Sequence, residues 1–229
     1  MAENIQELRQ HADALYAARE HAENVRASVE LLQRAARDDY GAAWRLGRAL
    51  FFLGQEATEK ERVRAFHRRG AAACARAARL EPRGVEGHFW LGVNLALRAR
   101  VEPFWRALPL ALRARRALQR AVSLDAAYHA AGPLRVLARL EHKLPRPLGG
   151  GQRRARAHFE QAIDLAPANT VTRLYFAEML LEQGQHQSAR VQLETLLNAP
   201  HDPAWNFESA RDRARAKELL LNEKLNMEN

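Results

Sequence analysis

The feature that most constrains the fold is a helical stripe of small and large residues that recurs along the chain. In the segment ARAHFEQAIDLAP, Ala155, Phe159 and Ala162 stand at i, i+4 and i+7, on one side of a helix, and Pro167 ends that helix. The two small residues allow a neighbouring helix to approach closely. The same spacing recurs at Gly70-Cys74-Ala77, Ala114-Leu118-Ala121 and Ala189-Leu193-Leu196, and more weakly at Ser28-Leu32-Ala35.

The spacing of these stripes predicts the architecture. Their last residues stand 42, 44, 41 and 34 residues apart. A period near 34 residues, lengthened in places by insertions, is typical of solenoids built from helical hairpins, and a hairpin buries its apolar face only against a neighbour. We therefore predict a single all-α domain over residues 1–229. Its hairpins cover roughly 3–38, 42–82, 86–126, 128–167 and 170–200, and a capping helix covers 205–225.

Two segments that contain proline or glycine interrupt this pattern, and the capping helix is expected to pack through an apolar face. Pro103 and Pro109 predict a kinked connection rather than one helix, with Phe104 and Trp105 folded back onto the array. Residues 144–151, LPRPLGGG, predict a glycine hinge. The capping helix is predicted to pack through the residues Ala210, Ala214, Leu219 and Leu220.

The chain is basic, and nearly all of its positive charge is arginine. Lys and Arg number 36 against 27 Asp and Glu, giving a net charge of +9, and only four of the 36 are lysine. Such a balance indicates acidic partners, which are nucleic acid, anionic lipid or acidic protein. The alternative is that arginine covers solvated helix faces, where it is a good helix former. The arginines are dispersed rather than gathered in one long run, which favours the alternative. Without a platform of aromatic and basic residues, nucleic acid is not favoured as a partner.

The single cysteine leaves the redox compartment of the protein open, and the N-terminal segment indicates its cellular compartment. Cys74 excludes an internal disulfide, and its place on a packing stripe predicts a core residue rather than a nucleophile. The N-terminal residues lack the apolar stretch of a signal peptide, and no run of about 18 apolar residues occurs. We expect a soluble, cytoplasmic protein, or a periplasmic one if a signal sequence has been removed.

Longer motifs carry a family resemblance. They are Trp44-Arg-Leu-Gly-Arg-Ala, His88-Phe-Trp-Leu-Gly-Val-Asn94, Gly132-Pro-Leu-Arg-Val-Leu, Leu144-Pro-x-Pro-Leu-Gly-Gly and the Ala155 stripe. The Leu-Gly pairs and the stripes resemble tetratricopeptide repeats (TPR). In this order, over roughly residues 28–220, the motifs resemble the T-component family of tripartite (TRAP) solute transporters, and distantly the microtubule-dynamics regulator repeat proteins.

The resemblance implies an all-helical, non-enzymatic protein that helps to bind or pass an apolar solute beside a periplasmic binding protein. Proteins of that family are usually exported and lipid-anchored. This sequence shows neither a signal sequence nor an N-terminal lipobox cysteine.

The sequence predicts no catalytic, metal or cofactor site. No two of the nine histidines have metal-ligand spacing, no nucleophile elbow is present, and only four serines occur. Gly149-Gly150-Gly151 before a helix could hold a phosphate, but the P-loop spacing and a preceding strand are missing, so a hinge is favoured. We therefore predict that the protein is not an enzyme and takes no cofactor.

The remaining candidate site is the inner surface of the array, which the first helix of each hairpin should line. An apolar lining with three arginines suits an amphipathic anion or a carboxylate-bearing peptide. Arg48, Arg135 and Arg139 are predicted to converge on the ligand, with Trp44 and Phe89 as the apolar wall. The alternative is that the large residues only pack the tighter inner curve. The predicted binding residues are Trp44, Arg48, Phe51, Phe89, Arg135, Arg139 and His142.

Two functional hypotheses follow. The first is a protein-interaction or scaffold module that binds a peptide or partner protein on its concave face. The basic charge of the chain would suit an acidic partner. The second is a solute-binding accessory protein of a TRAP-type system that takes an apolar or amphipathic anion. The sequence leaves the partner, the ligand and the oligomeric state open.

Overall fold

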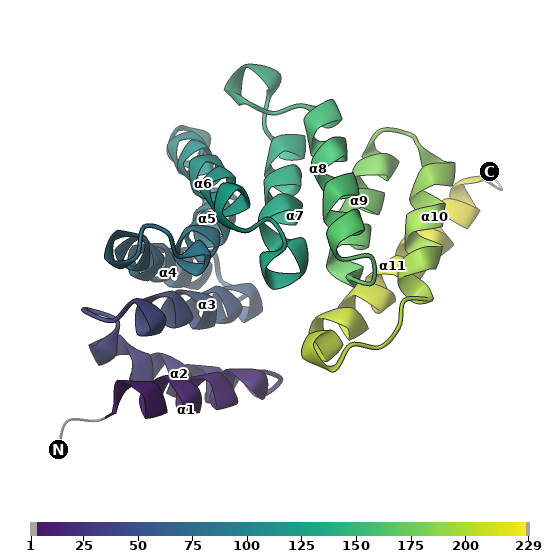
Figure 1. Cartoon of the computed structure of the whole chain (residues 1–229). Coiled ribbons are helices and arrows are strands. Elements are labelled where there is room, and N and C mark those ends of the chain that lie inside the picture. The colour runs from purple at the N-terminus through teal and green to yellow at the C-terminus, as the bar shows by residue number, and fades with distance from the viewer. Residues whose placement is uncertain (1–3, 228–229) are drawn as a thin grey trace. The chain divides into compact units, whose positions relative to one another are not determined.

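The computed structural model describes residues 4–227, except for the side chains of residue 204 and residues 223–227. This part of the chain contains eleven α-helices, two short 3-10 helices and no strand (Figure 1). The predicted all-α fold of helical hairpins with a terminal helix is confirmed. The chain divides into two compact units, residues 1–125 (unit 1) and residues 126–229 (unit 2), and each is described by itself. One array running through both units stays a prediction.

Unit 1 consists of three helical hairpins. Each helix packs against the next in the chain, and the third helix also contacts the first and the fifth. The helices are α1 Ile5–Ala17, α2 Ala22–Ala35, α3 Tyr40–Glu56, α4 Lys60–Leu80, α5 Val85–Ala99 and α6 Phe104–Leu124.

The repeated stripes and the Leu-Gly pairs form the two sides of the same helix contacts. Cys74 and Leu118, the central stripe residues of α4 and α6, are fully buried. A Cβ atom on Gly47 of α3 would overlap Cys74 Sγ, and one on Gly92 of α5 would lie 2.6 Å from Leu118 Cγ. Glycine is required at both positions because the facing helix leaves no room for a side chain.

Asn94 joins three helices of unit 1. It is fully buried in α5, and its Nδ2 donates to the carbonyl oxygens of Gly47 in α3, at 3.1 Å, and Trp90. Its Oδ1 lies 3.1 Å from Nδ1 of the buried His67 in α4. A buried amide whose hydrogen bonds are all made fixes the register of the helices around it.

The predicted kinked connection at residues 101–110 is wrong. α6 begins at Phe104, directly after Pro103, and passes through Pro109 as one helix. Pro109 lies in the second helical turn, where its missing N–H removes a single bond to the carbonyl of residue 105. Phe104 and Trp105 do not fold back onto the array, because they are 70% and 73% exposed.

Unit 2 consists of two hairpins and the terminal helix. α7 packs against α8 and α9 against α10, while α11 lies against both α9 and α10. The α-helices are α7 Tyr128–Lys143, α8 Gln152–Leu165, α9 Thr170–Glu182, α10 His186–Leu197 and α11 Asn206–Met227, and the 3-10 helices are η1 Arg146–Leu148 and η2 Pro203–Trp205.

The predicted stripes form the core of unit 2, but α11 uses a different face from the one predicted. Phe159 is fully buried and stacks on Phe176 of α9, with ring centroids 5.4 Å apart. Leu219 and Leu220 pack against this core as predicted. Ala210 and Ala214 are exposed, and Ala216 is buried instead. The prediction followed the alanines, whereas two polar side chains described below set the rotation of the helix.

α7 begins with a turn of left-handed backbone. His129, Ala130 and Ala131 all have positive φ, between 52° and 57°, and regular right-handed helix follows. This conformation costs an L-residue about 1–2 kcal/mol. Three such residues in succession require compensating contacts in the surrounding structure.

Candidate functional site

Four of the seven predicted binding residues lie in unit 1. Asp13 of α1 pairs with both Arg45 and Arg48 of α3, the latter through Nη2 and Oδ1 at 2.6 Å. Burial raises the pKa of the Asp13 carboxyl, but the hydrogen bonds and charges of the two arginines outweigh this and leave it below its ordinary value. The Arg48 guanidinium also lies over the rings of Tyr16, at 4.0 Å, and Trp44, at 5.1 Å.

The aromatic members of this group differ in exposure. Trp44 is buried at 9% exposed, whereas Phe51 is partly exposed, as Arg48 is. Phe89 is 2% exposed and packs against Trp90 with ring centroids 4.8 Å apart. Phe89 is therefore a core residue in this structure rather than an apolar wall for a ligand.

The other three predicted residues lie on α7 in unit 2. Arg139 pairs with Glu178 of α9 at 2.6 Å and lies over the Tyr175 ring. His142 Nε2 lies 3.2 Å from Glu182 Oε2, and Lys143 shares the same carboxylate. Burial lowers the pKa of His142, and the negative charge of Glu182 opposes that shift.

Arg135 is buried rather than presented to solvent. It is 4% exposed, and its Nη1 donates to Ala130 O at 2.8 Å, Asn169 Oδ1 at 3.2 Å and Thr172 Oγ1 at 3.4 Å. Burial lowers its pKa to about 10, so the guanidinium is still charged at neutral pH. Through the bond to Ala130 it compensates part of the strain in the left-handed turn.

The predicted binding residues thus form two separate groups. Within its own unit each of the three arginines already has a partner: Asp13 for Arg48, Glu178 for Arg139, and the buried polar atoms around Arg135. A carboxylate ligand would have to displace these contacts. A single surface that combines both groups stays a prediction.

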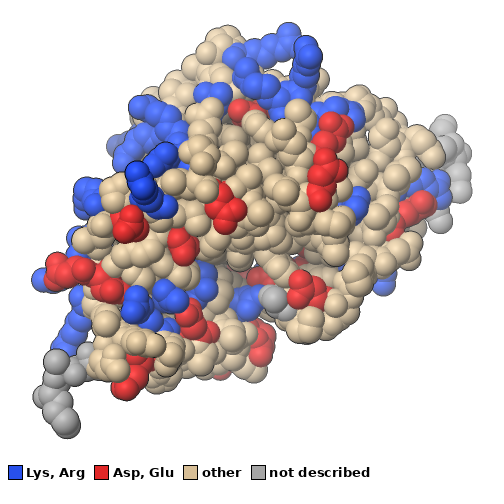
Figure 2. Space-filling view, in the orientation of Figure 1, with Lys and Arg blue, Asp and Glu red and all other residues tan. Residues whose placement is uncertain are grey.

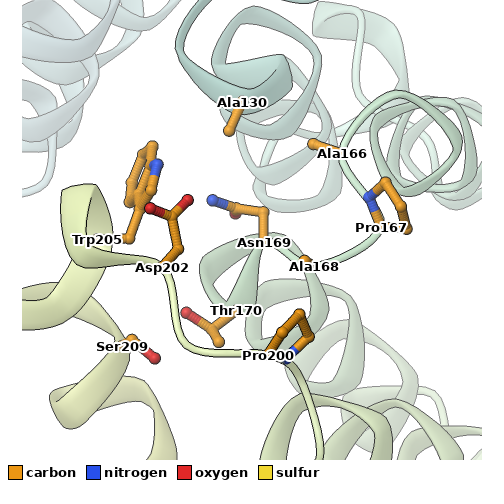
Figure 3. A pocket seen from close by; sticks show the side chains of 10 residues that line it. All are labelled: Ala130, Ala166, Pro167, Ala168, Asn169, Thr170, Pro200, Asp202, Trp205 and Ser209. Carbon is orange, nitrogen blue, oxygen red and sulfur yellow. The ribbon is translucent and has the colours of Figure 1, made fainter.

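The structure reveals a pocket in unit 2 that the sequence did not predict (Figure 3). Its volume is about 210 Å³. It lies among the start of α7, the turn between α8 and α9, the segment that leads into η2 and the start of α11. The lining residues are Ala130, Ala166, Pro167, Ala168, Asn169, Thr170, Pro200, Asp202, Trp205 and Ser209.

Asn169 is the polar residue that distinguishes this pocket. It caps the N-terminus of α9, and its Oδ1 accepts from Thr172 N, Thr172 Oγ1 and Arg135 Nη1. These three donors fix the orientation of the amide. Nδ2 points toward Asp202 and Trp205 (Figure 3), is shielded from solvent and has no hydrogen-bond partner among the described residues. An unsatisfied buried donor costs about 1–3 kcal/mol, which a bound acceptor would offset.

Two buried ionisable side chains, those of Asp212 and Arg135, lie behind the residues that line the pocket. Thr170 Oγ1 donates to Asp212 Oδ2 of α11 at 2.6 Å, and this contact, with the buried Ser209, fixes the rotation of α11. Burial raises the pKa of Asp212 to about 6, against the lowering effects of Thr170 and Arg135. Trp205 lies against the His129 ring, with centroids 4.7 Å apart, and 5.5 Å from the Arg135 guanidinium. The strained turn is thus one wall of the pocket.

The pocket residues carry only partial signals in the sequence. Asn169 and Thr170 follow Pro167, which is typical of a helix N-cap. That pattern does not show which amide donor remains unsatisfied. Asp202 and Trp205 are 33 or more positions away in the chain, and only the packing of α11 brings them to the cap.

The described residues contain no group of three or more metal-ligating side chains, and no helix among them has both the length and the apolar composition needed to cross a bilayer. Cys74 is fully buried, which raises the pKa of its thiol and disfavours the thiolate.

Comparison with known proteins agrees with this structure. A crystal structure of a thermophilic TPR protein from Thermus thermophilus is similar with a TM-score of 0.70 and 22% sequence identity, over 94% of this chain and 98% of that chain. This likeness shows the fold. No curated protein sequence matches. The family model described as TRAP transporter T-component matches residues 16–225. The chain therefore belongs to the TRAP transporter T-component family.

Proposed function

We propose that this protein is a non-catalytic accessory protein of a TRAP-type transport system and that it binds a small amphipathic solute in the unit 2 pocket. The observation that carries the proposal is the Asn169 amide, whose Nδ2 is directed into the pocket without a hydrogen-bond partner among the described residues. Membership of the T-component family supports the transport context, and the fold and family are both of non-catalytic kinds.

The lining defines the chemistry of the solute. Asn169 Nδ2 requires an acceptor such as a carbonyl oxygen, and the Trp205 ring with the alanines and prolines offers an apolar surface. The charges favour a neutral solute over the anion expected from the sequence. Asp202 lines the pocket with a carboxylate, while the nearest guanidinium, that of Arg135, lies buried and hydrogen-bonded behind the wall.

The solute must enter by a small local movement. Nδ2 is shielded from solvent, so an acceptor atom reaches it only after a covering side chain is displaced. Trp205 and Asp202 belong to a connecting segment rather than to a packed α-helix, and such segments open at low cost. Binding should therefore change the surroundings of Trp205.

A sharp test replaces Asn169 with Asp. Asn169→Asp keeps Oδ1 and its three contacts. It removes the side-chain NH₂ group, which is the donor to the solute, and places a carboxylate oxygen beside the acceptor atom of the solute. We expect calorimetric titrations with a panel of N-acetyl amino-acid amides to give affinities at least about tenfold weaker than for wild type, the equivalent of one hydrogen bond. The melting temperature should be unchanged or higher, because Asp is an equally good N-cap.

Asn222→Asp makes the same chemical change at an exposed position of α11 and should bind like wild type. Equal affinity of Asn169→Asp and wild type would refute the proposed site. Tighter binding of carboxylates than of amides of equal size would instead support the anion expected from the sequence.

A protein partner is the second candidate, favoured by the partly exposed Arg48 and Phe51 in unit 1. Aromatic and arginine side chains that reach the surface together are typical of interface centres. The T-component family implies association with other components of the transporter. Replacing Phe51 with Ser should weaken capture of the cognate solute-binding component and leave solute binding in unit 2 unchanged.

A further inference from the structure

The positive charge of the chain is concentrated in one part of unit 1. Residues 60–124, which we call the basic segment and which hold α4, α5 and α6, carry 15 Lys or Arg and 4 Asp or Glu, a net charge of +11. Residues 126–229 carry 14 basic and 12 acidic residues. Figure 2 shows Lys and Arg side chains over the part of unit 1 where α4 and α6 lie in Figure 1, and a further group over the connection between α7 and α8.

Most arginines of α4 and α6 are exposed and form no ion pair with any described residue. Exceptions are Arg64, which pairs with Glu61 and Glu102, and Arg115, which is only partly exposed. Charges of one sign held close together raise the energy of the isolated protein and attract an oppositely charged surface. The exposed arginines without an ion pair are Arg62, Arg68, Arg69, Arg76, Arg79, Arg106, Arg113, Arg116 and Arg120, of which Arg120 donates to the carbonyl oxygen of Pro82.

On α6 these arginines share one face with an exposed aromatic residue. Trp105, Pro109, Arg113, Arg116 and Arg120 stand at i, i+4, i+8, i+11 and i+15, which places them within an arc of about 80° at 3.6 residues per turn. All five are exposed. This face is therefore apolar at its N-terminal end and cationic along the rest of the helix.

Trp105 forms the apolar end of this face, and Phe104 precedes it, about 100° further around the helix. They are the most exposed of the large hydrophobic residues in the described chain, at 70% and 73%. Pro103 is the N-cap residue, and Phe104 and Trp105 are the first two residues of α6. A protruding pair of large aromatic side chains at the end of a cationic face is unfavourable in water and needs a partner with an apolar phase.

We propose that the outer face of α6, supported by the arginines of α4, docks onto the surface of an anionic lipid bilayer. Phe104 and Trp105 enter the headgroup region, where aromatic rings are favoured, and Arg113, Arg116 and Arg120 face the lipid phosphates. The proposal is independent of the solute pocket, because it uses different residues in a different unit.

The arrangement fits a bilayer better than a nucleic acid or an acidic protein. Single-stranded nucleic acid is bound by aromatic residues distributed along a basic groove so that successive bases stack. Here the two aromatic residues are adjacent at one end of the helix, and the arginines of the face, from Arg113 to Arg120, extend over about 10 Å of it. A bilayer offers both an apolar layer at one depth and a broad anionic plane above it.

The test measures partition of the full chain onto unilamellar vesicles by sedimentation. Vesicles of phosphatidylcholine alone are compared with vesicles containing one third phosphatidylglycerol, at low and at physiological salt. We expect binding to the anionic vesicles that weakens with salt, and a blue shift of tryptophan emission that is lost in Trp105→Ser. Weak or no binding to neutral vesicles is expected, because a two-residue wedge is too small to hold the protein by itself.

Two double variants separate charge from the aromatic wedge. Each arginine near an anionic surface contributes about fivefold to partition, so Arg113→Gln with Arg116→Gln should weaken binding about 25-fold. Phe104→Ser with Trp105→Ser should weaken it at least about tenfold, also at high salt. The matched charge control is Arg146→Gln with Arg153→Gln, which removes two exposed arginines from unit 2. The apolar control is Leu221→Ser, at a position 60% exposed on α11.

Equal effects of the α6 charge variant and the unit 2 control would overturn the assignment of the face, since net charge alone would then explain binding. Absence of binding to anionic vesicles at low salt would overturn the proposal. Tight binding to a single-stranded oligonucleotide or to polyglutamate without vesicle binding would also overturn it and would assign the face to that polymer.

Discussion

The arginines of the basic segment and those of unit 2 differ in what surrounds them. In unit 2, Arg139 pairs with Glu178 of α9, Arg173 of α9 donates to Gln192 of α10, and Arg213 bonds the carbonyl oxygens at the end of α10. On the outer faces of α4 and α6 no described acidic side chain pairs with most of the arginines. The same residue type thus holds helices together in one region and leaves charge available for a partner in the other. A net charge for the whole chain hides this difference.

The largest effect should come from an arginine placed where no partner exists. Ala162 is fully buried on the α8 stripe of unit 2, at a contact where helix axes lie about 8–10 Å apart. Ala162→Arg both overpacks this contact and buries an unpaired charge, and we expect a loss of at least about 4 kcal/mol in the free energy of unfolding. Urea unfolding followed by circular dichroism measures it. A near-normal midpoint would show that the stripe is not a packing surface.

A somewhat smaller loss is expected on removing the buried arginine of unit 2. Arg135→Gln is too short to reach Ala130 O and Asn169 Oδ1 together, which leaves buried acceptors unsatisfied and the left-handed turn unsupported. We expect destabilisation by about 3 kcal/mol. Arg116→Gln on α6 is the matched control, and equal melting temperatures for the two variants would contradict the comparison.

The third prediction uses the buried carboxyl behind the pocket. The folded-state pKa of Asp212 is about 6 against an ordinary value of 3.8, so folding favours its protonated form. Its contribution to stability is therefore fully present below about pH 4 and is lost as the pH rises through 6. Asp212→Asn should flatten the stability profile between pH 4 and 7 and stabilise the protein at pH 7 by about 2 kcal/mol. Parallel pH profiles for the two proteins would mean that Asp212 is not desolvated.

The smallest changes in stability are expected for arginines near the surface, and they should differ between unit 2 and the basic segment. Arg139→Gln removes a partly buried ion pair and should cost about 1 kcal/mol. The double change Arg113→Gln and Arg116→Gln removes no pair and should leave the melting temperature at low salt unchanged or slightly raised, because like charges are removed. Thermal unfolding at two salt concentrations checks both. Destabilisation by the α6 variant would reveal a structural role for these arginines.

The sequence predicted the helices and their packing faces because those depend on local spacing. The stripes at Cys74, Leu118, Phe159 and Leu193 are all fully buried. Short periodic patterns determine which side of a helix is apolar, and glycine marks where two helices approach closely. The connection at residues 101–110 was wrong because the two prolines suggested a break, whereas Pro103 precedes the helix and Pro109 lies in its second turn.

The pocket could not be predicted in the same way. It depends on contacts among residues far apart in the chain and on backbone conformations without a sequence signal. Neither Ala130 nor Ala131 has a residue type that indicates left-handed backbone, and the position of Trp205 depends on how α11 packs. The binding role of Arg48, Arg135 and Arg139 stays a prediction, because a sequence shows where charges occur but not which of them already have partners.

The most direct measurement of the central claim follows the side-chain amide of Asn169 by NMR. In the ¹⁵N-labelled full chain, its NH₂ resonances can be assigned by their loss in Asn169→Asp and titrated with the tightest-binding N-acetyl amino-acid amide. We predict a downfield proton shift that saturates with the affinity measured by calorimetry. The result that would contradict the account is solute binding with the Asn169 amide resonances unchanged.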